Sequence, residues 1–410
     1  GCSVGLGWDP RFPRAWSGLQ PASPSLTDTT PPGALRLGMV AGETSGDLLA
    51  GLLLQGLKAR WPALAAGGIG GPRMVALGFD AWWPADKLSL FGYVDVLLNY
   101  RELVGIRNAL GDRLVAQRPD VFVGVDAPDF NFGLERRLRE AGIKTVHFVC
   151  PSIWAWRGER VKTLAAAADH VLCLFPFEPE LLHAHGIKAT YVGHPLAQVI
   201  PLEPDRAAAR AALNLPDTAQ VVALLPGSRR SEIRLIAPRV LAAAAILHRQ
   251  RAGLRFVLPV APGMRALVEP LLLRHAPGVP VDLLEGRSHD ALAACDVTLV
   301  ASGTATLEAA LFKRPMVVTY VVSWFNALRM KRLRLQPWVG LPNVLCREFV
   351  VPELLQDAAT PAALAQATIE WLDDAARRER VRVRFNELHH LLRRDTVRES
   401  ADAIAQVLKA

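Results

Sequence analysis

The 410-residue sequence has few cysteines and no long apolar run. Its five cysteines are scattered and form no C-x-x-C pair, which disfavours a zinc or redox site and favours a reducing cytoplasm. No segment offers about 18 uninterrupted apolar residues, and no basic segment followed by an apolar run opens the chain. We therefore expect neither a membrane-spanning helix nor an export signal.

Several catalytic and binding signatures are also missing. The first candidate ligand loop, residues 41–47, lacks the spacing of a G-x-G-x-x-G dinucleotide site, a P-loop or a G-x-S-x-G elbow. These absences weaken the NAD-dependent and hydrolase alternatives. Zinc-finger spacing, an RNP-type aromatic strand and a convincing carboxylate–histidine cluster are lacking too, so we expect no nucleic-acid partner and no metal site.

The composition suits a globular protein of two domains with an anionic partner. Hydrophobic residues make up 51% of the chain and charged residues 21%. A chain of this length exceeds what one hydrophobic core usually supports. The formal net charge of +8 favours phosphorylated metabolites or an acidic membrane leaflet, and charge alone does not choose between them.

The order of the apolar runs predicts an α/β fold with two doubly wound domains facing a central cleft. Short apolar runs alternate with helical patterns, which is typical of βαβ units in parallel sheets. The predicted strands are 35–40, 121–125, 145–149, 170–174, 190–192, 221–225, 256–260, 281–284, 297–300 and 316–320. We predict one Rossmann-like domain over 34–197 and a second over 198–385. Helices over 386–410 are expected to pack back on the N-terminal domain. Residues 1–33, rich in Pro, Ser, Gly and Thr, are predicted to be disordered.

Polar residues follow three strands of the predicted N-terminal domain. Glu43 and Ser45 lie in a loop that is either a ligand site or a capped turn. Asp126 and Asp129 follow a buried-type strand, at the edge where open α/β sheets bind ligands. We interpret Asp126 as a general base for a sugar hydroxyl, while Asp129 is equally suited to cap the next helix. Trp154 either contacts a sugar face or packs in the core.

Two strand-to-helix loops of the predicted C-terminal domain suit an anionic ligand. Gly227, Ser228 and Arg229 offer N–H groups, a hydroxyl and a guanidinium, and the alternative is a capped helix with surface arginines. The second loop also offers N–H groups and hydroxyls at the start of a helix, from Ser302, Gly303 and Thr304. Glu308, one turn later, either accepts hydrogen bonds from ribose hydroxyls or faces solvent.

Two segments have the composition of a membrane interface. The first contains Leu90, Phe91, Val94 and Leu97 and is followed by arginines, and the second, 323–338, mixes tryptophan and leucine with arginine and lysine. Basic, aromatic and apolar stretches of this kind suit a lipid surface. Core packing or a dimer contact is an equal alternative for both.

Eight segments together resemble the lipid-A-disaccharide synthase family in order and spacing, over about residues 34–410. They are A-G-E-T-S-G-D, G-G-P-R-M, V-D-A-P-D-F-N, P-S-I-W-A-W, G-H-P, L-P-G-S-R, S-G-T-A-T-L-E and L-P-N. The resemblance implies a GT-B fold and an inverting transfer that needs neither metal nor cofactor. By this resemblance Asp126 and Arg229 match essential residues, and Glu308 and Asn343 fall in donor-site motifs.

The resemblance also implies a reaction and partners. A hexosyltransferase of lipid A biosynthesis would join UDP-2,3-diacylglucosamine to 2,3-diacylglucosamine 1-phosphate, releasing UDP and a β-1,6-linked disaccharide. It implies a homodimer that exchanges C-terminal parts on the cytoplasmic face of a Gram-negative inner membrane. The extension before Leu35 and the aspartate at Asp95 depart from the family pattern. A UDP-sugar 2-epimerase, another GT-B transferase and a non-enzymatic lipid- or nucleotide-binding protein are the alternatives.

Overall fold

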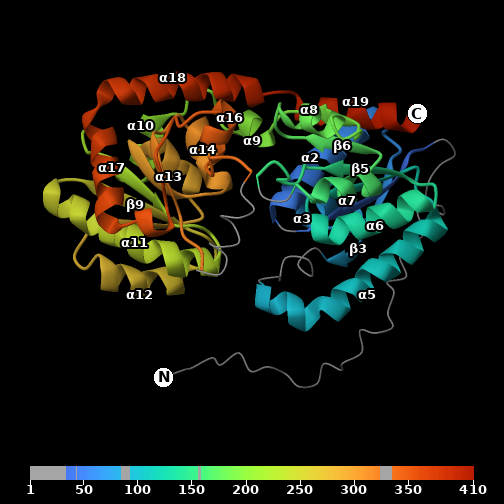
Figure 1. The fold of residues 1–410 in the computed structure, drawn as a ribbon, viewed down its shortest axis with the longest axis horizontal. Helices are drawn as coiled ribbons and strands as arrows, with labels where there is room; N and C mark the ends of the chain where they lie inside the picture. The colour runs from blue at the N-terminus through green and yellow to red at the C-terminus, as the bar shows by residue number, and fades with distance from the viewer. Residues whose placement is uncertain (1–33, 43, 85–92, 156–157, 324–334) are drawn as a thin grey trace. The chain divides into compact units, whose positions relative to one another are not determined.

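The computed structural model describes residues 34–42, 44–84, 93–155, 158–323 and 335–410 (Figure 1). These residues form two compact units. The first contains the described residues up to Phe148, with Ala166–His170 and Ala401–Ala410. The second contains the described residues of Val149–Ala165 and Val171–Ser400, so it includes the predicted boundary at residue 197.

The N-terminal half of the chain supplies a seven-stranded sheet in the order β3-β2-β1-β4-β5-β6-β7. Its strands are β1 (Arg36–Ala41), β2 (Ala65–Gly70), β3 (Asp80–Pro84), β4 (Val121–Val125), β5 (Lys144–Phe148), β6 (His170–Cys173) and β7 (Ala189–Tyr191). The described pairings are parallel; for example, Val40 lies opposite Ile69 of β2 and Gly124 of β4. The strand order reverses between β1 and β4, which is where open α/β sheets place their ligand crevice.

Amphipathic helices cover this sheet. They are α2 (Thr44–Arg60), α3 (Pro72–Ala76), α5 (Tyr93–Gln117), α6 (Pro128–Glu140), α7 (Arg160–Ala167) and α8 (Glu178–His183). The short helix α9 (Pro195–Val199) follows the last strand, and its Ala197 packs in the core of the second half. Leu110 and Leu114 of α5 share a core with Phe122 of β4 and with Leu134 and Leu138 of α6. Figure 1 shows α5 and α6 together on one face of the sheet.

The second sheet has six strands in the order β10-β9-β8-β11-β12-β13. Its strands are β8 (Val221–Leu225), β9 (Arg255–Val260), β10 (Val281–Glu285), β11 (Val297–Ala301), β12 (Met316–Tyr320) and β13 (Glu353–Leu355). β8 and β11 are buried along their whole length, as central parallel strands with both faces covered should be. They are direct neighbours, with Val300 opposite Leu225, so the loops that follow them leave the same edge.

The helices of this half connect and cover the second sheet. They are α10 (Arg206–Ala212), α11 (Arg230–Gln250), α12 (Arg265–His275), α13 (Ser288–Ala294), α14 (Thr304–Leu311), α16 (Leu341–Cys346), α17 (Pro361–Asp373) and α18 (Ala375–Leu392). The last helix, α19 (Thr396–Lys409), follows α18. The end of α19 belongs to the first unit, where Asp402 forms an ion pair with Arg60 of α2.

Several predicted features fall outside the described residues. These are the segment 1–33, Glu43, Leu90, Phe91 and most of the second interface-like segment. Val94 and Leu97 lie within α5. Among the helices that the structure describes, none is both long and apolar enough to cross a bilayer.

Candidate active site

Asp126 stands at the carboxyl end of β4 in a strained backbone. Asp126 and Ala127 both adopt left-handed conformations, with φ of 51° and 42°. Non-glycine residues rarely adopt such conformations, and they persist where surrounding contacts hold them. Here the N–H of Asp126 donates to the carbonyl of Phe148 at 2.9 Å, and Asn131 Nδ2 donates to the carbonyl of Asp126 at 2.8 Å.

The side chain of Asp126 is half-buried, and no described residue donates a hydrogen bond to its carboxylate. A general base needs a fixed position and a carboxylate that can accept a hydrogen bond from the substrate hydroxyl. Asp126 meets both requirements among the described residues. Asp129 lies exposed in the first turn of α6. The N-cap of that helix is Ala127, whose side chain makes no cap bond, so the predicted cap by Asp129 does not form at that position.

A buried polar pair lies behind this strand end. His147 Nδ1 of β5 lies 2.7 Å from Glu135 Oε1 of α6, and both side chains are fully buried. Burial raises the pKa of Glu135. A Cβ at Gly124 would come within 2.1 Å of Glu135 Oε1, so only glycine leaves room for this pair beneath β4. Sequence reasoning did not single out Glu135, although a glutamate on the inner face of a helix is a usable signal.

The loop after β1 is organised around Asp47. Ser45 lies in the first turn of α2, and Asp47 follows it, almost fully buried. The carboxylate of Asp47 accepts hydrogen bonds from the N–H groups of Gly71, Arg73 and Met74, at 3.1, 3.0 and 3.3 Å. Asp47 thus accepts hydrogen bonds from the N–H groups at the start of α3. It joins the segment A-G-E-T-S-G-D to the segment G-G-P-R-M.

The loop after β8 places two backbone N–H donors at the start of a long helix. Gly227 has a φ of 110°, and Arg229 is the N-cap of α11. Ser228 and Arg229 are exposed. Their backbone N–H groups donate to Glu232 Oε2, at 3.2 and 3.3 Å. A carboxylate therefore already occupies the position where a phosphate oxygen would accept these bonds.

The neighbouring loop after β11 offers a second open helix start. Gly303 has a φ of 145° and a Cβ there would meet only open space, while Thr304, the first residue of α14, is exposed. Ser302 is held by its N–H, which donates to the carbonyl of Thr319 at 2.8 Å, and by its Oγ, which donates to the carbonyl of Val339 at 3.2 Å. Backbone N–H groups at the start of a helix are suited to an anionic ligand.

Glu308 is half-buried rather than turned freely to solvent. Its Oε2 lies 3.1 Å from Nε2 of His289, and this hydrogen bond raises the pKa of His289. His289 also packs edge-on against Phe312. His289 thus orients the carboxylate of Glu308, for which the sequence left a ribose contact and a solvent-facing position as alternatives.

Asn343 is completely buried, and its amide is fully engaged within the protein. Its Nδ2 donates to the carbonyl of Val351 at 2.9 Å and to Glu353 Oε1 at 2.8 Å, and its Oδ1 accepts from the N–H of Val351 at 3.0 Å. Glu353 Oε1 in turn accepts from the N–H of Gly340 at 2.8 Å, at the start of α16. The Asn343 side chain therefore supports this loop. This leaves the backbone groups of the loop to contact a sugar nucleotide.

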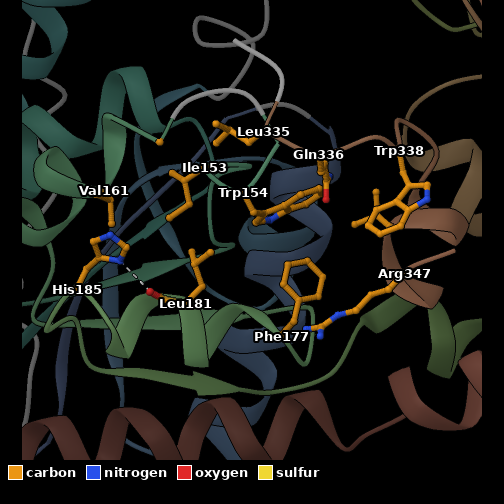
Figure 2. Close-up of a pocket in the computed structure, with 12 residues that line it drawn as sticks. Ile153, Trp154, Val161, Phe177, Leu181, His185, Leu335, Gln336, Trp338 and Arg347 are labelled. Carbon is orange, nitrogen blue, oxygen red and sulfur yellow. Dashed lines mark hydrogen bonds between the residues drawn. The ribbon is translucent and has the colours of Figure 1, made fainter.

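Trp154 forms one wall of a cavity (Figure 2). Its indole Nε1 donates to Glu178 Oε1 at 3.1 Å, and the N–H of Phe175 donates to Glu178 Oε2 at 3.0 Å. Glu178 is buried, and burial raises its pKa to about 8. Sequence reasoning missed Glu178, although a glutamate among the aromatic residues of F-P-F-E-P signals a buried carboxyl.

Comparison with known proteins decides the family. A model of the lipid-A-disaccharide synthetase family matches residues 37–407. The chain belongs to the lipid-A-disaccharide synthase family. The synthase of Albidiferax ferrireducens is 58% identical over 380 residues, which are 92% of this chain and 98% of that protein. The synthase of Verminephrobacter eiseniae is 56% identical over 381 residues, or 91% and 97% of the two chains.

Solved structures show the same fold at low identity. The UDP-GlcNAc 2-epimerase of Neisseria meningitidis bound to UDP-GlcNAc has a TM-score of 0.62 at 12% identity, covering 92% of this chain and 100% of that one. MurG of Acinetobacter baumannii has a TM-score of 0.56 at 13% identity, covering 91% and 99%. These matches confirm the predicted GT-B fold. The synthase family membership makes the chain a hexosyltransferase of lipid A biosynthesis and sets the epimerase alternative aside.

Proposed function

We propose that the chain transfers 2,3-diacylglucosamine from UDP to the 6-hydroxyl of 2,3-diacylglucosamine 1-phosphate. The bond between the anomeric carbon and the β-phosphate oxygen breaks as the bond to O6 forms on the opposite face, so the configuration inverts. The O6 proton passes to the carboxylate of Asp126. The products are the β-1,6-linked disaccharide 1-phosphate and UDP.

The observation that carries this proposal is the state of Asp126. Its backbone is held in a left-handed conformation by two hydrogen bonds, and its carboxylate has no described donor. A positioned base of this kind contributes about 10²- to 10⁴-fold in rate. Asp126 therefore supplies the acid–base chemistry of the reaction.

Donor binding is assigned to the β8 and β11 loops. As UDP departs, negative charge grows on its β-phosphate, and preorganised donors stabilise such charge. Arg229 and the N–H groups near Ser228, Gly303 and Thr304 supply these donors, and Glu308 accepts from the ribose. We propose that these groups suffice without a metal ion or cofactor.

We further propose that the enzyme is a homodimer with exchanged C-terminal parts, working on the cytoplasmic face of the inner membrane. The net charge of +8 and the acylated substrates support membrane association. Co-sedimentation with anionic and zwitterionic vesicles tests this, since electrostatic attraction should favour the anionic ones. Equal binding to both, or to neither, would contradict it.

The reaction is tested by incubating the purified chain with both acylated sugars in detergent micelles containing a chelator. We expect UDP release matched by disaccharide, with a β linkage seen by NMR. UDP release without disaccharide would contradict the transfer. Activity lost to the chelator and restored by a divalent cation would contradict the metal-independent part alone.

A further inference from the structure

The second unit contains a cavity of about 420 Å³, and all the residues that line it belong to that unit (Figure 2). This volume lies within the range of small-molecule sites. Most of its lining is apolar, including Ile153, Trp154, Val161, Leu181, Leu335 and Trp338. Apolar cavities of this size take apolar groups, because water gains few hydrogen bonds there.

The cavity walls are held in place by hydrogen bonds. Glu178 fixes the indole of Trp154 from behind, with Nε1 to Oε1 at 3.1 Å. The N–H of Leu335 donates to the carbonyl of Ala155 at 3.1 Å, which joins two of the three chain segments that line the cavity. A site built in this way loses little conformational freedom when a ligand binds.

The cavity adjoins the candidate donor site along the chain and through hydrogen bonds. Trp338 precedes Val339, whose carbonyl accepts from Ser302 Oγ at 3.2 Å. On the other side, the N–H of Leu341 donates to Thr306 Oγ1 of α14 at 3.3 Å. The cavity and the loop that starts α14 are therefore linked through residues 338–341. A sugar whose diphosphate binds at this loop lies near the segment that leads to the cavity.

One side chain that lines the cavity carries a positive charge. This is Arg347, and no described carboxylate is among the lining residues. Leu335 is 60% exposed, and Phe349, whose ring lies 6.3 Å from that of Trp338, is 62% exposed. Exposed apolar side chains beside positive charge suit a ligand that is both apolar and anionic.

We propose that this cavity binds one fatty acyl chain of the UDP-activated donor sugar. The chain lies among Trp154, Val161 and Leu181, and Leu335 covers its entrance. This inference rests on the proposed function, in which the donor is acylated. It makes the cavity, rather than the nucleotide loops, the element that selects acylated from unacylated donors.

The test measures binding of UDP-sugars by calorimetry without acceptor, so that it does not depend on turnover. The probes are UDP, UDP-glucosamine and UDP-2,3-diacylglucosamines of increasing short chain length, each below its critical micelle concentration and without detergent. For the wild type we expect the Kd to fall by roughly fourfold per methylene, equivalent to about 0.8 kcal/mol, until the cavity is full.

Leu181→Trp fills part of the cavity and should end this gain at a shorter chain, with the Kd of UDP unchanged. Leu273→Trp is the matched control, because Leu273 is 75% exposed on α12 and lies outside the cavity. Leu335→Ser is a second variant at an exposed position, which avoids core disruption. It should weaken the binding of acylated donors several-fold while leaving that of UDP unchanged.

Three results would overturn the inference. They are a Kd that does not depend on chain length in the wild type, the same dependence in Leu181→Trp and Leu335→Ser as in the control, or a Kd of UDP that weakens in these variants as much as that of the acylated donors. Failure of the proposed function is a different result, since it would appear as donor binding without disaccharide formation.

Discussion

Replacing Glu232 by glutamine is expected to tighten the binding of UDP. In the structure, Glu232 Oε2 accepts from the N–H groups of Ser228 and Arg229 at 3.2 and 3.3 Å. These are the donors that a diphosphate needs at the start of α11. A ligand phosphate must therefore displace the carboxylate or lie beside its negative charge.

The magnitude follows from the two bonds. Both are long and lie at an exposed loop, so each contributes at the low end of the usual net value of about 0.5–1.5 kcal/mol. A neutral amide competes less for the donors and does not repel phosphate. We expect the Kd of UDP to fall about 3- to 10-fold, equivalent to about 0.7–1.4 kcal/mol. Loss of the charge at the helix N-terminus should destabilise the fold by about 0.3–1 kcal/mol.

Calorimetric titration with UDP measures this effect in the wild type, in Glu232→Gln and in a control, Glu269→Gln. Glu269 pairs with Arg265 on the exposed face of α12. The difference between wild type and Glu232→Gln should shrink at high salt, because exposed charges are then screened. Unchanged or weaker UDP binding in Glu232→Gln would refute the competition between carboxylate and phosphate.

Two further predictions concern stability. Burial raises the pKa of Glu178 from 4.5 to about 8. Between these two pH values the folded state keeps a proton that the unfolded state releases, so the stability of the fold falls as the pH rises from one to the other. Denaturant unfolding should show the wild type losing up to about 1.4 kcal/mol per pH unit relative to Glu178→Gln between about pH 5 and 8, and parallel profiles would contradict this. Asn343→Ala leaves buried groups around Val351 and Glu353 unpaired and should cost about 1–3 kcal/mol, whereas the exposed Gln366→Ala should cost less than about 0.5 kcal/mol. Similar unfolding midpoints for the two variants would mean that Asn343 does not support its loop.

The strands with apolar, β-branched sequences could be predicted from the sequence, and those that depend on tertiary contacts could not. Val121–Val125, Val221–Leu225 and Met316–Tyr320 are typical buried strands and are confirmed. β2 was missed because its sequence, A-A-G-G-I-G, has few side chains. The reason appears only in the fold, where a Cβ at Gly67 would lie 2.6 Å from Trp82 and one at Gly68 would lie 2.0 Å from the carbonyl oxygen of Met39.

Two edge strands were missed for a related reason. β3 contains two tryptophans and ends in Pro84, and β13 has three residues. Short or proline-bearing strands at a sheet edge carry little periodic signal. Their pairing to β2 and β12 is a property of the sheet rather than of the segment.

The site could be predicted as far as the strand ends that carry it. Asp126 follows a strand of the first sheet and Arg229 follows a strand of the second. Within each sheet, parallel strands bring their carboxyl ends to one edge. The partners of these residues are distant in sequence, as with Asn343 and Glu353 or Trp154 and Glu178. Pattern reasoning does not identify such pairs, because no periodicity links the two members.

The central claim is that Asp126 is the base. The most direct measurement is kcat for disaccharide formation by the wild type, Asp126→Asn and Asp112→Asn, with the Kd of UDP measured for each. Asp112 is exposed on α5, where its pair with Arg137 is expected to contribute little. The account predicts a loss of about 10²- to 10⁴-fold in kcat for Asp126→Asn alone, with UDP binding unchanged. An Asp126→Asn enzyme that retains the kcat of the wild type would contradict it.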